Sequence, residues 1–101
     1  SVYRLTLEAD RQLTEIWRYT AGRWGVRQAD DYLAALEATC EKAAATPSLL
    51  RPRADLSPDL GAIKSGSHMV FARIDSDGVL LIVSILHGAW MQRVTTAGPR
   101  K

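Results

Sequence analysis

Residues 68–87 read HMVFARIDSDGVLLIVSILH, and this stretch decides the fold because two apolar runs flank a turn signal. Apolar side chains alternate with others through His68–Asp75 and recur through Val79–His87, as they do in β-strands. The Asp77-Gly78 pair between the runs is typical of a tight hairpin turn, in which both central residues have positive φ. The stretch therefore predicts a β-hairpin.

The register of this hairpin depends on the turn. With Asp77-Gly78 central, His68 faces His87, and with Ser76-Asp77 central, His68 faces Ile85. In either register one face carries both histidines, and apolar residues share that face: Val70, Ala72, Ile74, Leu81, Val83 and Ile85. The opposite face carries Phe71, Ile82 and Leu86. Since both faces are apolar, we expect the hairpin to lie mid-sheet and to be covered at least in part on both sides.

The residues before the hairpin predict two helices between short strands. Alternation from Tyr3 begins a first strand, Thr6 can cap a helix over Leu7–Trp24, and Gly25 ends it. A second helical pattern begins almost at once, with an apolar stripe that starts at Ala29, and runs to about Thr46, before Pro47. The connection is short, so the two helices must be antiparallel neighbours. Residues 47–60 predict a loop, and 62–64 a further short strand.

The predicted order is β-α-α-β-β-β, in the α+β class, with a small antiparallel sheet packed by an antiparallel helical hairpin. The 101 residues, 47% apolar and 24% charged, suit one globular domain over 1–101 with a flexible tail at 95–101. No apolar run is long enough for a membrane span. A single cysteine, Cys40, cannot form an internal disulfide, which favours a cytoplasmic setting.

Few residues carry recognisable chemistry. His68 and His87 can act as a general acid and base for RNA cleavage, supply two metal ligands, or simply close the end of the hairpin. No third ligand stands at a telling spacing, and no glycine-rich phosphate loop is present, so we expect neither metal nor cofactor. Cys40 lies on an apolar stripe, as expected for an inert buried thiol. Trp17 and Trp24 are either core residues or anchors for a partner.

Several ordered motifs together resemble one family. They are Tyr3-Arg4-Leu5-Thr6, Ile16-Trp17-Arg18-Tyr19-Thr20, Arg23-Trp24-Gly25, Ser65-Gly66-Ser67-His68-Met69-Val70-Phe71 and Ile85-Leu86-His87-Gly88. Over about residues 2–93 the chain resembles the ParE toxins of the RelE/ParE superfamily, from bacterial type II toxin–antitoxin systems. The resemblance implies a cytoplasmic toxin that poisons DNA gyrase and is held inactive by a ParD-type antitoxin. It implies contact with DNA only through gyrase or the antitoxin, and none with membranes.

Relatives that cleave mRNA share this fold and use basic side chains and a tyrosine. His68, Gly88 and Val94 stand where those relatives carry arginine, arginine and tyrosine, and cations of this kind stabilise the charge that develops on phosphate. The resemblance therefore favours a non-catalytic, gyrase-directed toxin. Two alternatives stay open: a ribosome-dependent mRNA endoribonuclease using His68 and His87, and a degenerate toxin that acts only in operon autoregulation with its antitoxin.

The partner surfaces follow from exposed aromatic and basic residue types. We expect the antitoxin to contact Trp17, Arg18, Tyr32 and Leu36 on the helical hairpin. We expect gyrase to contact Trp90, Met91 and Arg93, because tryptophan and arginine are frequent in binding hot spots and methionine adapts to irregular surfaces. No acidic residue follows Asp77, so this end of the chain suits an acidic patch or DNA held by gyrase.

Overall fold

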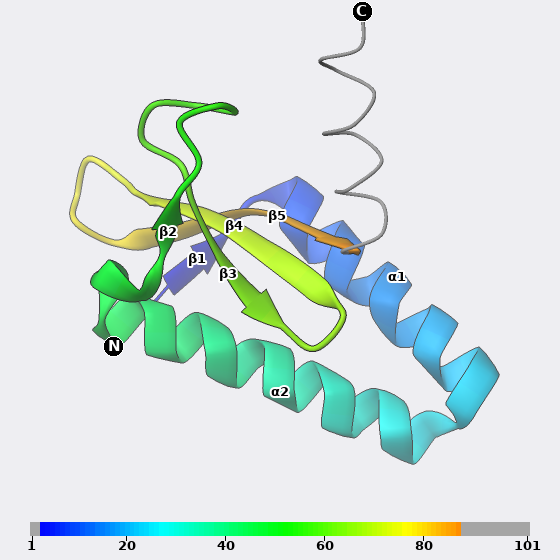
Figure 1. The fold of residues 1–101 in the computed structure, drawn as a ribbon. Helices are drawn as coiled ribbons and strands as arrows, with labels where there is room; N and C mark the ends of the chain where they lie inside the picture. Colours follow the sequence, from blue (N-terminus) through cyan, green and yellow to red (C-terminus); the bar gives the residue numbers. More distant parts are fainter. Residues whose placement is uncertain (1–2, 88–101) are drawn as a thin grey trace, which may run out of the picture.

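Two consecutive helices dominate the computed structural model, which describes residues 3–87 (Figure 1). Helix α1 (Leu7–Trp24) begins at Thr6, whose hydroxyl accepts a hydrogen bond from the amide of Ala9 at 3.1 Å. Gly25 alone joins α1 to α2 (Val26–Ala45), which ends before Pro47. The predicted bounds of α1 are confirmed, and α2 begins directly after Gly25, as the second periodic run predicted.

Five strands form one sheet on which the helical hairpin packs. They are β1 (Tyr3–Leu5), β2 (Arg51–Pro52), β3 (Gly61–Ser65), β4 (His68–Ile74) and β5 (Leu80–His87), and a 3-10 turn over Pro47–Leu49 precedes β2. The order across the sheet is β1-β5-β4-β3-β2. The α+β class and the helical hairpin are confirmed, and β2 adds a short edge strand within the predicted loop.

The sheet is mixed, which corrects the expectation of an antiparallel one. β1 runs parallel to β5, with Arg4 opposite Leu81, while all other neighbours are antiparallel. Alternation in a short segment identifies the face that is buried but not the strand that will lie beside it. The sequence of β1 therefore could not indicate that this strand runs parallel to its neighbour.

The β4–β5 turn differs from the predicted one. The amide of Gly78 donates to the carbonyl of Asp75 at 2.9 Å, so Ser76 and Asp77 are the central residues, and only Gly78 has positive φ, at 84°. This is a three-residue loop with a left-handed glycine at its end. His68 nevertheless faces His87, because a bulge between Phe71 and the next residue shifts the register by one.

The bulge also reverses the predicted faces of residues 80–83. Ala72 lies opposite Ile82 and Phe71 opposite Ser84, so Val83 has no partner on β4. Leu80 and Ile82 consequently share the core-facing side of the sheet with Val70, whereas Leu81 and Val83 were predicted to share a face with Val70 and Ile82 to lie on the opposite one. Because of the bulge, the carbonyl of Val83 has no partner on β4. It accepts a hydrogen bond from the hydroxyl of Thr6, the residue that caps α1, at 2.9 Å.

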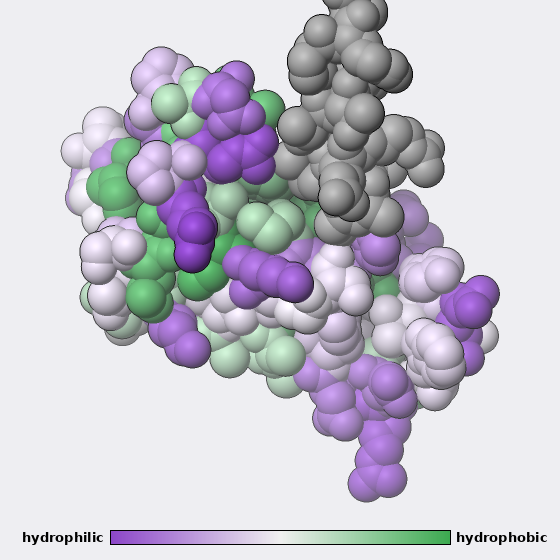
Figure 2. All heavy atoms as spheres, viewed as in Figure 1, coloured by the Kyte–Doolittle hydropathy of each residue, from purple (hydrophilic) through white to green (hydrophobic). Residues whose placement is uncertain are grey.

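Apolar side chains fill both sides of the central strands, as predicted. The main core lies between helices and sheet, and its largest fully buried members are Leu36, Leu80, Ile82 and Val70. On the other face Ala62 and Phe71 are buried, packed by Leu60, Met69 and Leu86. Figure 2 shows hydrophobic residues gathered over the strands, with hydrophilic side chains crossing them.

Within residues 3–87, neither helix combines the length and the apolar content needed to cross a membrane.

Candidate binding groove

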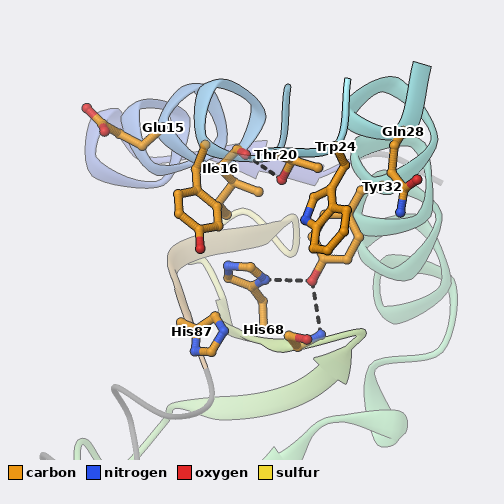
Figure 3. Close-up of a pocket in the computed structure, with 10 residues that line it drawn as sticks. Glu15, Ile16, Thr20, Trp24, Gln28, Tyr32, His68 and His87 are labelled. Carbon is orange, nitrogen blue, oxygen red and sulfur yellow. Dashed lines mark hydrogen bonds between the residues drawn. The ribbon is translucent and has the colours of Figure 1, made fainter. Parts of the chain in front are cut away.

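A groove of about 630 Å³ opens where the helical hairpin meets the ends of β4 and β5 (Figure 3). Residues from four elements and one turn line it: Glu15, Ile16, Tyr19, Thr20 and Trp24 of α1, Gln28 and Tyr32 of α2, Ser67 of the β3–β4 turn, His68 of β4 and His87 of β5. Five of these ten side chains carry planar rings, and Ile16 is the only aliphatic one. We call this cavity the ring groove.

The two histidines meet at the floor of the ring groove. They are paired across β4 and β5, and their ring centroids lie 5.2 Å apart with an interplanar angle of 84°. The register predicted with Asp77-Gly78 central is thus correct for this pair, although it arises from a different turn and a bulge.

Tyr32 fixes His68 from the helical side. Its hydroxyl lies 2.6 Å from Nδ1 of His68 and accepts a hydrogen bond from the amide of Ser67 at 3.0 Å (Figure 3). The rings of Tyr32 and His68 also meet edge to face, with centroids 5.5 Å apart. One phenol therefore joins α2 to the β3–β4 turn and to the first residue of β4.

The surroundings of His68 favour the neutral imidazole. Burial lowers the pKa of His68 below its ordinary value, and the neighbouring His87 lowers it further. Within residues 3–87, no carboxylate hydrogen-bonds to His68, and no cluster of three or more metal-ligating side chains is present. A neutral imidazole held by a phenol can accept or donate a hydrogen bond to a ligand, but it lacks the orienting acid of a catalytic pair.

The four residues predicted to contact the antitoxin do not form one surface. Leu36 is fully buried in the main core, so its prediction as a contact residue is wrong. It lies one helical turn beyond Tyr32, on the α2 stripe that faces the sheet. Trp17 is partly buried, and its indole N–H donates to Asp30 at 2.9 Å, while Arg18 is exposed. Tyr32 is partly buried in the ring groove.

The predicted gyrase contacts Trp90, Met91 and Arg93 lie outside the described residues, as does the predicted tail at 95–101. Cys40 is buried as predicted, and burial together with Glu37 and Glu41 raises the pKa of its thiol to about 11. This thiol is protonated at neutral pH, which is the state of an unreactive cysteine.

Sequence reasoning missed the mouth of the ring groove. Tyr19 and Trp24 are 64% and 61% exposed, although Trp24 continues the apolar stripe of α1. The last turn of α1 extends past the strands, so its stripe has no sheet to cover there (Figure 1). The guanidinium of Arg23 lies 5.8 Å from the ring centroid of Tyr19 and 5.7 Å from that of Trp24. The sequence left Trp24 open as a core residue or a partner anchor, and it gave no sign that Tyr19 would be exposed beside it.

Comparison with known proteins agrees with the fold and with the sequence motifs. The family described as "ParE toxin of type II toxin-antitoxin system, parDE" matches residues 3–90. Toxin ParE1 of Mycobacterium tuberculosis is 38% identical over 87 residues, covering 86% of this chain and 89% of that protein. Toxin ParE1 of Caulobacter vibrioides is 42% identical over 86 residues, covering 84% and 86%.

A solved structure shares the architecture at low sequence identity. The structure titled "Chromosomal ParDE TA system from P. aeruginosa" matches with a TM-score of 0.73 and 13% identity, covering 84% of this chain and 92% of that one. This likeness shows the fold, and the family match spans every described strand and helix. The chain therefore belongs to the ParE toxin family of type II toxin–antitoxin systems.

Proposed function

We propose that this ParE toxin acts in the cytoplasm by inhibiting DNA gyrase through protein contacts, and that a ParD-type antitoxin neutralises it. The observation that carries the proposal is the family match over residues 3–90, which includes the complete helical hairpin and sheet. The toxins that match over most of their length are named ParE or ParE1.

The chemistry at the ring groove supports action without catalysis. Cleavage of RNA needs a base, an acid and cations that stabilise the charge of the transition state. Here His68 has a lowered pKa, and its Nδ1 is engaged by the hydroxyl of Tyr32. We therefore assign His68 and His87 a structural role.

We place antitoxin recognition on the outer surface of the helical hairpin, with Trp17 as an anchor and Arg18 at the rim. Tyr32 contributes through the ring groove, where it is partly exposed. We place gyrase recognition on Trp90, Met91 and Arg93. If the two surfaces are separate, replacing both Trp90 and Arg93 by alanine abolishes gyrase inhibition while antitoxin binding persists. Loss of both activities, or of neither, would contradict this separation.

One assay tests the proposed function directly. The purified chain is incubated with gyrase, ATP and supercoiled plasmid, and the products are scored for linear DNA, with a reaction lacking gyrase as the control. We expect linear DNA that depends on both proteins and disappears when a ParD-type antitoxin is added. Absence of linear DNA and of supercoiling inhibition, from a folded chain, would refute gyrase as the target.

The close pair of His68 and His87 supports a second candidate function, that of a ribosome-dependent endoribonuclease. The matched variant is His68→Gln with His87→Gln, which retains hydrogen-bonding groups but removes both imidazoles. Under our proposal the double variant still inhibits gyrase, and the parent chain leaves mRNA on translating ribosomes intact. Cleavage of that mRNA by the parent, lost in the double variant, would establish the ribonuclease instead.

A further inference from the structure

The exposed end of the helical hairpin presents an arginine between two aromatic rings. Tyr19 and Trp24 are more than half exposed, and the guanidinium of Arg23 lies within 6 Å of both ring centroids. Large aromatic side chains that stay in water forgo the stabilisation of burial, so their exposure is typical of binding surfaces. Tyr19 and Trp24 line the ring groove and form its mouth, and Arg23 lies beside both rings.

The interior of the ring groove suits a flat, polar ligand. An apolar partner helix is recognised by rows of aliphatic and aromatic pockets, and this groove has one aliphatic side chain, Ile16. Its rings can stack on a planar group, and the amide of Gln28 and the hydroxyl of Thr20 can hydrogen-bond to the edge of such a group.

The local charge favours an anion. Residues 16–29 contain three arginines, Arg18, Arg23 and Arg27, and no acidic residue. All three are exposed, and none forms an ion pair with another residue of the 3–87 region. Glu15 is the one carboxylate that lines the groove, and Figure 3 shows it directed away from the rings of Trp24 and Tyr32.

From these three features we propose that the ring groove and its mouth bind single-stranded DNA directly. An unpaired base stacks among the rings at the mouth, and the flanking phosphates contact Arg23 and Arg27. Single-strand binding sites combine stacking aromatic side chains with cations along the backbone path, and base–aromatic stacking tolerates any sequence. The choice of DNA over RNA rests on the proposed function, since gyrase holds DNA. This contact is additional to the indirect contacts that the sequence predicted.

The test measures binding of a fluorescent oligodeoxythymidylate of about 12 nucleotides, the size of a single-strand site, to the full chain without gyrase. Fluorescence anisotropy at about 0.1 M salt, where the Debye length is about 10 Å, gives the affinity. We expect Trp24→Ala to weaken binding by about tenfold, the lower range for loss of one stacking contact. Arg23→Gln with Arg27→Gln should reduce the dependence of log affinity on log salt by about 0.7 per lost phosphate contact.

The control is Arg51→Gln, which removes one exposed positive charge from β2, an edge strand two positions from β4. It should leave the affinity within about twofold of the parent value, because net charge alone contributes little at this distance under salt screening. Thermal unfolding of every variant confirms that the fold is retained.

Three results would overturn the proposal. They are no oligonucleotide binding by the folded parent, equal losses in the control and the arginine variants, or clearly tighter binding of an oligouridylate or of an acidic peptide in competition. The binding assay contains no gyrase, whereas the plasmid assay tests the proposed function. A lack of oligonucleotide binding is therefore distinguishable from a lack of gyrase inhibition.

Discussion

The β3–β4 turn is the point at which a single methyl group should disturb the ring groove most. Gly66 has φ of +59°, and a Cβ built on it would lie 2.8 Å from both Cε1 and Oη of Tyr32. That ring cannot move freely, because its hydroxyl is engaged by His68 and by the amide of Ser67. We therefore expect Gly66→Ala to strain the turn and to displace Tyr32.

The chain offers a matched control for the backbone part of this effect. Gly78, in the β4–β5 turn, also has positive φ, at 84°, but a Cβ there would meet nothing within 4 Å. Gly78→Ala should reduce the free energy of unfolding by about 1–2 kcal/mol, the range for a left-handed alanine. Gly66→Ala should lose a further 1–3 kcal/mol, roughly, because it also overpacks against the tyrosine ring.

Urea unfolding followed by circular dichroism measures both losses under one set of conditions. In a Tyr32→Leu background, Gly66→Ala should lower the free energy of unfolding by little more than Gly78→Ala does, because the clashing ring atoms are then absent. Equal losses for Gly66→Ala and Gly78→Ala, or an excess unchanged by Tyr32→Leu, would refute the claim that Tyr32 is held rigidly against this turn.

Three further predictions concern single side chains. Trp17→Ala should weaken antitoxin binding by more than about 1 kcal/mol, measured by calorimetry with a ParD-type antitoxin, and a variant that unfolds instead would make Trp17 a core residue. The pKa of His68 is lower in the folded state than its ordinary 6.5, so the unfolded chain binds the proton more readily, and the free energy of unfolding should fall as pH drops through 6.5. His68→Gln should flatten that dependence, and an unchanged pH profile would show that His68 is not its cause. Cys40, with a pKa of about 11, should react with iodoacetamide at neutral pH roughly a hundredfold more slowly than in urea; comparable rates would mean that α2 opens readily.

The elements of the fold were predictable where local chemistry sets their limits. The capping hydroxyl of Thr6 and the glycine at position 25 fix the two ends of α1 through short-range hydrogen bonds and backbone geometry, so the bounds of α1 were predicted. The sequence did not predict which faces residues 80–83 occupy, because the bulge at Val83 is stabilised from outside the hairpin, by the hydroxyl of Thr6.

The candidate site was predictable only in part, for a similar reason. The pairing of His68 with His87 follows from one hairpin, whereas Tyr32 reaches His68 from a helix 36 residues earlier in the chain. The sequence predicted both Tyr32 and Leu36 as partner contacts, whereas only Tyr32 retains an exposed edge in the structure. The exposure of Tyr19 and Trp24 beside Arg23 depends on how far α1 extends beyond the sheet, and no local sequence pattern specifies that distance.

The parallel pairing of β1 with β5 gives the molecule a late step in folding. The hydroxyl of Thr6 donates to a carbonyl 77 residues away, and β1 lies beside no strand other than β5 within residues 3–87. Contacts between such distant segments form slowly, because a large loop must close before they stabilise anything. A nascent chain therefore has no partner for β1 until β5 has left the ribosome, and this edge of the sheet closes only after the other described strands have been synthesised.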